Sequence, residues 1–320
     1  MTGSARTLKI GTRGSDLARW QATRVQALLA ARGVPAELVT IRTSGDEGSL
    51  GRPAPGATGK GLFTKEIEDA LLEGRVDLAV HSLKDLSAEL PAGLTIAAYP
   101  EREDPRDALV SARGGDLPSL PRGARVGTSS LRRRAALLAA RSDLEVVALR
   151  GNVPTRVKKV GRDGLDAAVL ALAGLKRLGL ADGAVPLGLE WFPPAPGQGA
   201  LALEARAKDG AVLDVLRPLD LPAVRCAVEA ERTALLELEG GCQAAIGAFC
   251  EPGRDGLVLH VRVFAPDGTR QLSARAPVDP GDPAKGGRMV AHELVRQGAR
   301  DLIRAADEFA LRSGIGRAEA

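Results

Sequence analysis

The stretch FTKEIEDALLEGRVDLAVHS, residues 63–82, predicts an amphipathic helix that runs directly into a short β-strand. The same alternation extends on both sides of it. LKIGTR (8–13) and ELVTIRT (37–43) predict strands, and Ser15 is placed to cap an amphipathic helix after the first of them. This alternation is typical of α/β layers with largely parallel sheets.

A second run of the same pattern follows. Its segments are ARVGTSS (124–130), EVVALR (145–150), NVPTRVKK (152–159), DAAVLA (166–171) and LAGLKRLG (172–179). The proline-rich piece WFPPAPGQG (191–199) predicts a hinge or crossover, because proline stiffens a segment and glycine permits tight turns. Two similar α/β units are therefore expected.

From Pro222 onward the pattern of helices and strands changes. A helix over 222–240 precedes strands around AAIGAFCE (244–251), GLVLHVRVFA (256–265) and RQLSARAPV (270–278), and a last helix begins near Lys285. The sequence thus predicts a small C-terminal α+β domain.

The composition of the chain limits the classes of function that it can have. The 320 residues are 44% apolar and 26% charged, as in ordinary globular chains. We expect a cytoplasmic protein, because there is no membrane-length apolar run and no secretory signal. Aromatic residues make up only 2% of the chain, which disfavours stacking on single-stranded nucleic acid. The net charge of +4 is modest and is explained by solubility alone, but with nucleic acid disfavoured, small acidic molecules are the better expected partners.

Three cysteines in no Cys-x-x-Cys pair argue against a disulfide framework or a zinc site. Cys242 lies in EGGCQ, where two glycines let the backbone turn and expose a thiol for covalent chemistry. Spacing alone leaves simple packing equally open for Cys242. Cys226, in a helix, and Cys250, in a strand, are expected to pack.

Polar residues gather where strands end, which is where α/β sheets place ligand sites. Asp85 follows VHSLK, and its alternative role is a helix cap or a surface pair with Lys84. Guanidinium groups and hydroxyls at strand ends and helix starts suit carboxylate binding, although a solvated face explains any single arginine. The residues of this set are Arg13, Ser15, Thr128, Ser129, Ser130, Arg132, Arg133, Arg134, Arg150, Arg156 and Arg177.

The remaining motifs concern a long loop and possible phosphate or metal sites. The Gly/Pro-rich stretch from Ser44 to Gly61 has no periodicity, and we interpret it as a lid, with simple disorder as the open alternative. No Walker or dinucleotide spacing is present, and His81, His260 and His292 are scattered, so no metal site is predicted.

Seven motifs together resemble the porphobilinogen deaminase family, in order along most of the chain. They are GTRGSDLARWQ, KGLFTKEIEDALLEGRVDLAVHSLKD, VGTSSLRRRAALL, LRGNVPTR, AGLKRLG, PGQGALALEAR and LEGGCQAAIGA. The resemblance implies two α/β domains like type-2 periplasmic binding proteins around a cleft, plus an open-faced C-terminal α+β domain. The implied boundaries are 1–102 with 200–220, then 103–199, and 221–320.

The resemblance also implies roles. Cys242 would hold a dipyrromethane cofactor through a thioether, and Asp85 would be catalytic. Carboxylate binding would fall to Arg13, Ser15, Lys84, Thr128, Ser130, Arg132, Arg133, Arg150, Arg156 and Arg177. Lys60 and Phe63 would belong to the lid loop and Gln198 to the cleft. The substrate would be porphobilinogen and the protein a monomer, with no metal, nucleic acid or membrane partner.

Two alternatives from other classes stay open at this point. A noncatalytic two-lobed receptor for an organic anion would share the α/β units and the arginines but would not need Cys242. A nucleic-acid regulator would use Arg132 to Arg134 and would show salt-dependent DNA binding.

Overall fold

The computed structural model describes residues 6–43, 64–239, 244–254 and 256–313. Its described residues divide into two compact units. Unit 1 comprises residues up to Glu103 together with Ala200–Arg225, and unit 2 comprises Asp104–Gly199 together with the chain from Cys226. The three-domain division and the cleft remain predictions.

Unit 1 is built on a five-stranded sheet of order β2-β1-β3-β10-β4. Strands β1, β2 and β3 are parallel, and β10 is antiparallel to both of its neighbours. The elements of this unit are β1 (Leu8–Thr12), α1 (Asp16–Ala30), β2 (Ala36–Thr40), α3 (Lys65–Leu72), β3 (Leu78–Ser82), the 3-10 helix η1 (Leu83–Asp85), β4 (Leu94–Ala98), β10 (Leu201–Arg206), α7 (Gly210–Leu216) and the 3-10 helix η2 (Arg217–Leu219).

Helices cover both faces of this sheet. One face packs against α1 and α7 through a cluster that includes Ile10, Val25, Leu203 and Leu216. The other face packs against α3, where Ile67 meets the opposite side of the sheet. Period-2 alternation along the strands explains the two-sided burial.

Unit 2 contains a second five-stranded sheet, of order β7-β6-β8-β5-β9. Its parallel strands are β7, β6 and β8, and β5 is antiparallel to both neighbours. The position of the antiparallel strand matches that of β10 in unit 1, so the two sheets share one topology. The elements are β5 (Asp107–Ser111), β6 (Arg125–Gly127), α4 (Leu131–Ala140), β7 (Glu145–Val147), α5 (Val153–Lys159), β8 (Ala167–Ala171), α6 (Leu172–Arg177) and β9 (Val185–Pro186).

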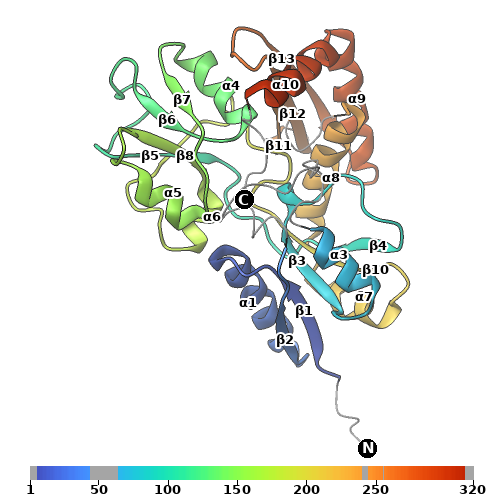
Figure 1. Ribbon diagram of the computed structural model, residues 1–320. Helices are drawn as coiled ribbons and strands as arrows, with labels where there is room; N and C mark the ends of the chain where they lie inside the picture. The colour runs from blue at the N-terminus through green and yellow to red at the C-terminus, as the bar shows by residue number, and fades with distance from the viewer. Residues whose placement is uncertain (1–5, 44–63, 240–243, 255, 314–320) are drawn as a thin grey trace, which may run out of the picture. The chain divides into compact units, whose positions relative to one another are not determined.

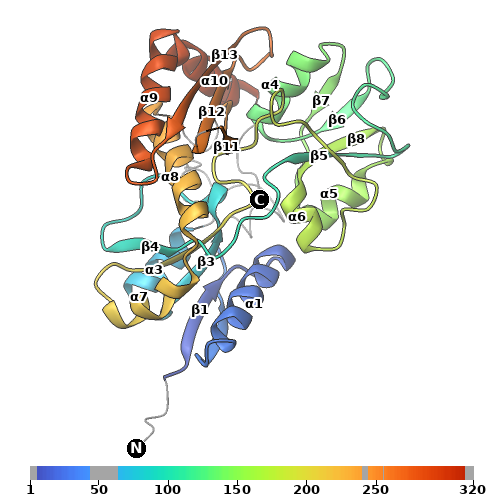
Figure 2. The same ribbon diagram turned by 180° about the vertical axis from the view of Figure 1, so that it is seen from behind.

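Helices also cover both faces of this second sheet: α4 packs on one face, and α5 and α6 pack on the other (Figure 2).

The C-terminal part of unit 2 is a three-stranded antiparallel sheet of order β11-β12-β13. Its elements are α8 (Pro222–Glu237), β11 (Ile246–Gly253), β12 (Gly256–Phe264), β13 (Gln271–Val278), α9 (Pro283–Arg296) and α10 (Ala299–Ser313).

One face of the three-stranded sheet packs against α8, α9 and α10 through a continuous apolar cluster (Figure 1). The expected α/β class with a C-terminal α+β part is therefore confirmed. The single C-terminal helix expected from Lys285 is two helices, because Gly298 between them has a φ of +96°, which ends α9.

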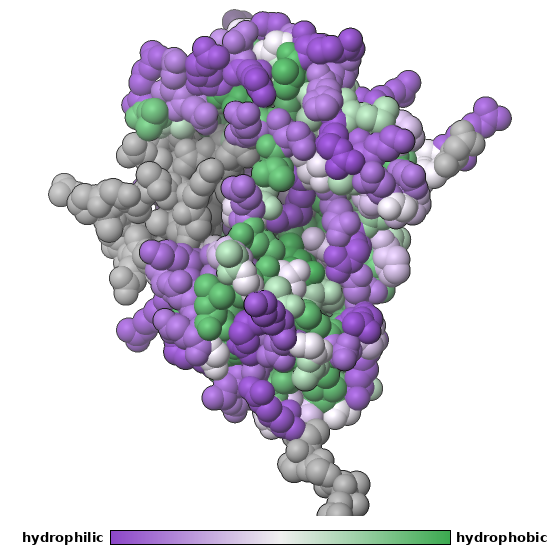
Figure 3. All heavy atoms as spheres, turned by 90° about the vertical axis from the view of Figure 1, so that its right-hand side faces the viewer, coloured by the Kyte–Doolittle hydropathy of each residue, from purple (hydrophilic) through white to green (hydrophobic). Residues whose placement is uncertain are grey.

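Figure 3 shows one face of the molecule, on which hydrophobic residues are interrupted by hydrophilic ones. Among the described helices, none combines the length and the low charge that a bilayer crossing requires.

Candidate functional site

The turn after β6 sets up the first part of the candidate site. Ser130 caps α4, its Oγ accepting the Arg133 backbone N–H at 3.4 Å, and its own N–H donates to Thr128 Oγ1 at 3.2 Å. Thr128 is buried. Because the cap fixes the first turn of α4, it also fixes the direction in which Arg132 and Arg133 leave the helix.

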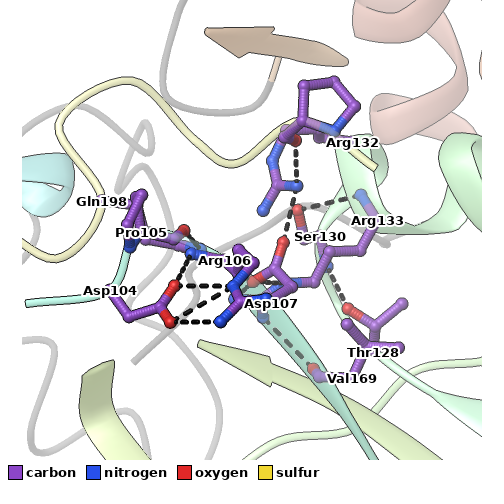
Figure 4. Close-up of polar contacts among 11 residues, drawn as sticks. Asp104, Pro105, Arg106, Asp107, Thr128, Ser130, Arg132, Arg133, Val169 and Gln198 are labelled. Atoms are coloured by element: carbon purple, nitrogen blue, oxygen red, sulfur yellow. Dashed lines mark hydrogen bonds and ion pairs between the residues drawn. The ribbon is translucent and has the colours of Figure 1, made fainter. Parts of the chain in front are cut away.

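Both of these arginines converge on Asp107, the first residue of β5 (Figure 4). Arg132 donates from a terminal nitrogen to Asp107 Oδ2 at 2.8 Å and also to the Pro193 carbonyl at 2.7 Å. Arg133 donates to Asp107 Oδ1 from Nε at 3.1 Å and from a terminal nitrogen at 2.9 Å. The three side chains are almost fully buried, so Asp107 orients two guanidinium groups inside the protein.

The charge of Asp107 is stable in this environment. Burial by itself would raise its pKa, but the positive charges of Arg132 and Arg133 and the hydrogen bonds from Arg132 and Gln198 outweigh burial and hold the pKa at about 2. One carboxylate therefore stays ionised between two guanidinium ions at neutral pH.

Gln198 brings the PGQG segment to the same place. Its Nε2 donates to Asp107 Oδ1 at 2.9 Å and to the Pro105 carbonyl at 2.8 Å (Figure 4). Glu231 on α8 holds the same segment from the other side, its carboxylate accepting the Gly197 N–H at 2.8 Å and the Cys250 N–H at 2.8 Å. Close by, Asp104 pairs with Arg106 at 2.7 Å.

Two more predicted arginines are buried in the helices that follow β7 and β8, Arg156 in α5 and Arg177 in the last turn of α6. Arg156 donates from Nε to the Gly151 carbonyl at 2.6 Å, and Arg177 donates to the Gly199 carbonyl at 2.7 Å. Gly151 has a φ of +115°, which a residue with a Cβ rarely adopts, and this conformation helps to aim its carbonyl. Hydrogen bonds to carbonyls orient a guanidinium group but leave its charge in place. Arg150, in contrast, is exposed.

Arg134, the third residue of the arginine run, faces elsewhere. It donates to the Val146 carbonyl at 3.0 Å, and its guanidinium lies 5.2 Å from the centre of the Phe309 ring on α10. Its described contacts are therefore structural. Since Arg132 and Arg133 are buried, the run does not form an exposed basic strip of the kind that would contact nucleic-acid phosphates.

The remaining predicted residues lie in unit 1. Arg13 and Ser15 follow β1, while Lys84 and Asp85 follow β3 in η1. Because β1 and β3 are adjacent and parallel, their carboxyl ends meet at one edge of the sheet. Ser15 caps α1 by accepting the Ala18 N–H at 3.3 Å, and Gln21 of α1 donates to Ser82 Oγ at 2.7 Å. All four predicted side chains are half-buried.

Three predicted site residues, Cys242, Lys60 and Phe63, lie outside the described residues, as does the stretch interpreted as a lid. Of the other thiols, Cys226 is buried in the core of the C-terminal sheet, and burial raises its pKa. Cys250 is half-buried and donates to the Ala227 carbonyl at 3.4 Å. Both positions agree with the expected packing roles and leave these thiols poorly suited to nucleophilic attack.

Within the described ranges no group of three histidine, cysteine, aspartate or glutamate side chains is arranged to hold a metal ion. The donors near the strand ends are guanidinium, ammonium, hydroxyl and amide groups, which fit an organic anion. Sequence reasoning missed Asp107. Its only signal was an acidic residue opening the apolar run DALVS.

Two α/β sheets of one topology, each with cationic and hydroxyl side chains at the carboxyl ends of its parallel strands, define an α/β protein with a candidate site for an organic anion. Comparison with known proteins identifies it further. Residues 8–214 match the family model described as "Porphobilinogen deaminase, dipyromethane cofactor binding domain", and residues 225–296 match "Porphobilinogen deaminase, C-terminal domain". The chain belongs to the porphobilinogen deaminase family.

Individual relatives agree. The chain is 49% identical over 301 residues to the porphobilinogen deaminase of Moorella thermoacetica, covering 92% of this chain and 95% of that protein. It is 46% identical over 305 residues to that of Geobacter sulfurreducens, covering 92% and 93%. Among solved structures, the methionine-binding protein MetQ is 14% identical with a TM-score of 0.44, covering 67% of this chain and 89% of that one.

Proposed function

We propose that this chain is a transferase that joins four molecules of porphobilinogen head to tail, with loss of ammonia, and releases the linear tetrapyrrole hydroxymethylbilane by hydrolysis. Family membership supports the reaction. The observation that carries it is the set of buried guanidinium groups on the helices that follow β6, β7 and β8, with Arg132 and Arg133 oriented by Asp107.

The arginines are proposed to bind the acetate and propionate groups of the pyrrole rings. A guanidinium fork matches a carboxylate with two parallel hydrogen bonds, and a chain that grows ring by ring adds carboxylates with each step. The buried members, Arg132, Arg133, Arg156 and Arg177, are pre-oriented by protein acceptors. Arg13, Lys84 and Arg150, with the hydroxyls of Ser15, Thr128 and Ser130, complete the proposed set.

Asp85 is proposed as the catalytic residue. Loss of ammonia from porphobilinogen leaves a cationic azafulvene, and a carboxylate held next to the pyrrole nitrogen stabilises that developing positive charge. Asp85 is half-buried in η1 at the carboxyl end of β3, with Lys84 beside it in the chain. This position agrees with contact to a ligand at the strand ends.

The family model names a dipyrromethane cofactor, and the strand-end donors fit such a carboxylate-bearing group. When bound, the dipyrromethane supplies the primer on which the chain is built. We propose Cys242 as its attachment point, with the arginines above holding its carboxylates.

Replacing Cys242 with serine is expected to give a folded protein without attached dipyrrole, because a hydroxyl does not form the thioether. Intact-protein mass spectrometry of material produced with ample precursor measures this directly. Cys226→Ser and Cys250→Ser are matched controls that should retain the added mass. A dipyrrole mass that persists in Cys242→Ser would remove Cys242 from this role.

A binding protein for an organic anion would use the same arginines without turnover. The two functions separate when purified protein is incubated with porphobilinogen and both ammonia and linear tetrapyrrole are measured. Stoichiometric release of ammonia with tetrapyrrole formation supports the transferase. Binding with no ammonia released would favour the receptor. Monomeric state and cytoplasmic location remain predictions.

A further inference from the structure

Three ionisable side chains are buried together on the α3 face of the unit 1 sheet. They are His81 on β3, Glu204 on β10 and Glu68 on α3, and their exposed fractions are 6%, 0% and 7%. None of them belongs to the strand-end set proposed to bind substrate. Buried ionisable groups are costly, so a cluster of three calls for a physical reason.

Strand register places two of them on one face. In the antiparallel pair of β10 and β3, Ala202 is opposite His81 and Glu204 is opposite Ala79. Ala79 packs with Ile67 and Leu71 of α3, so Glu204 and His81 share that face as diagonal neighbours. Glu68 follows Ile67 in the same helix and is likewise buried.

If both glutamates of this cluster are ionised, their carboxylates lack part of the hydrogen bonding that burial requires. His81 Nε2 and Glu204 Oε2 are hydrogen-bonded at 2.9 Å. The other oxygen of Glu204, Oε1, has no hydrogen-bond partner among the described residues, and neither does Oε1 of Glu68. Two ionised carboxylates here would repel each other while each kept an unsatisfied buried oxygen.

Protonation of Glu68 relieves both problems. Burial and the negative charge of Glu204 raise the pKa of Glu68. The Thr64 hydroxyl and His81 oppose this rise only in part, and the Thr64 oxygen is outside hydrogen-bond geometry with the described residues. A neutral Glu68 adds an O–H donor where a buried acceptor lacks one.

The other charged groups around α3 do not replace this donor. Asp69, on the same helix, is exposed and also raises the pKa of Glu68. Arg206 of β10 donates to the Leu71 and Val76 carbonyls at the far end of α3. Lys9 of β1 is exposed, and β4 carries no ionisable side chain.

We propose that Glu68 and Glu204 share one proton, so that Glu68 is a neutral acid donating to Glu204 while Glu204 accepts from His81. This chain of hydrogen bonds ties α3 and β10 to the carboxyl end of β3. His81 is four residues before Asp85, so Glu204 is a positioning residue for the Lys84–Asp85 segment. That last step rests on the proposed function, whereas the shared proton does not.

Infrared difference spectroscopy tests the shared proton. Above pH 4.5, where an ordinary glutamate is ionised, the unchanged protein minus Glu68→Gln should still show the carbonyl band of a protonated carboxylic acid. In Glu204→Gln the same band should titrate at lower pH, because the neighbouring negative charge that favours the proton is gone. Glu37→Gln, an exposed glutamate of β2, is the matched control and should leave the spectrum in this region unchanged.

The pH dependence of the melting temperature is a second test of the shared proton, and the proposal predicts its direction. A proton held more tightly in the folded state stabilises that state at low pH, and this contribution is lost as the pH rises through the raised pKa. Above pH 4.5, the ordinary pKa of the group, the melting temperature of the unchanged protein should therefore fall relative to that of Glu68→Gln. A difference independent of pH would contradict the proposal.

Activity then separates the two parts of the inference. Glu68→Gln preserves a neutral donor and should keep the turnover of the unchanged protein, while Glu204→Gln should lose about ten-fold or more through displacement of the β3 end. If the acid band is absent or Glu68→Gln is as damaging as Glu204→Gln, the shared proton is wrong. If the band is present but neither variant affects turnover, the positioning role is wrong and the shared proton stands.

Discussion

Replacing Asp85 with asparagine is expected to slow turnover of porphobilinogen by about a hundred-fold or more, while the protein still folds and retains its attached dipyrrole. The amide keeps the size of the side chain but removes the negative charge that stabilises a developing cation. Asp85 is half-buried at the carboxyl end of β3, where substitution should disturb the core little. The rate of tetrapyrrole formation and the intact mass of the variant measure the two halves of this expectation.

The control for Asp85→Asn is Asp214→Asn in the same unit. Asp214 pairs with Arg217 at 2.8 Å, but both side chains are mostly exposed, so its loss should change neither rate nor mass. Near-normal turnover by Asp85→Asn would remove Asp85 from the mechanism. Loss of the dipyrrole from Asp85→Asn would instead assign this residue to cofactor retention.

Local pattern was enough to predict much of the fold. The cap at Ser15, the helix that begins at Val153 after Asn152, and the strands around Leu78–Ser82 and Leu201–Arg206 lie where residue periodicity placed them. These features depend on neighbours within a few residues, which a single sequence displays. The strand β5 was missed, because its pairing with β8 joins Asp107 to Ala171 across a long sequence separation.

In the candidate site, too, local features could be predicted from the sequence and long-range contacts could not. Strand ends could be predicted, and with them the positions of Arg132, Arg156 and Asp85. Asp107 could not, because aspartate is usually exposed, and nothing local indicates that two arginines 25 and 26 residues later will bury it. The run Arg132–Arg134 reads as one basic patch in sequence, yet the helix turns Arg134 toward Phe309.

Replacing Asp107 with asparagine is expected to destabilise the protein strongly, by about 3–5 kcal/mol, because it leaves two buried guanidinium ions without their shared carboxylate. The melting temperature should fall on the order of 10 °C. Thermal unfolding followed by circular dichroism measures this. Asp301→Asn is the matched control: Asp301 pairs with Arg304 at 3.9 Å in the same unit, both side chains are mostly exposed so that solvent screens the charges, and little change is expected.

The contribution of Asp107 to the stability of the folded protein depends on pH, and its lowered pKa fixes the direction. The pKa of Asp107 falls from 3.8 to about 2 on folding, which corresponds to about 2 kcal/mol of stability. A lowered pKa stabilises the folded state above the unfolded pKa, so this contribution is complete above about pH 4 and is lost as the pH falls toward 2. Asp107→Asn should therefore lose less stability than the unchanged protein over that interval.

A second substitution distinguishes lost charge balance from lost packing. In the double variant Asp107→Asn/Arg133→Met one buried positive charge is removed together with the carboxylate, and an apolar chain occupies its path. Part of the stability lost in Asp107→Asn should return, since replacing both partners of a buried pair is far less costly than removing one. The opposite result would be a double variant whose free energy of unfolding is lower than that of Asp107→Asn. In that case Asp107 does not act by balancing the charge of Arg133. The guanidinium groups proposed to bind substrate carboxylates would then have to be oriented by other contacts.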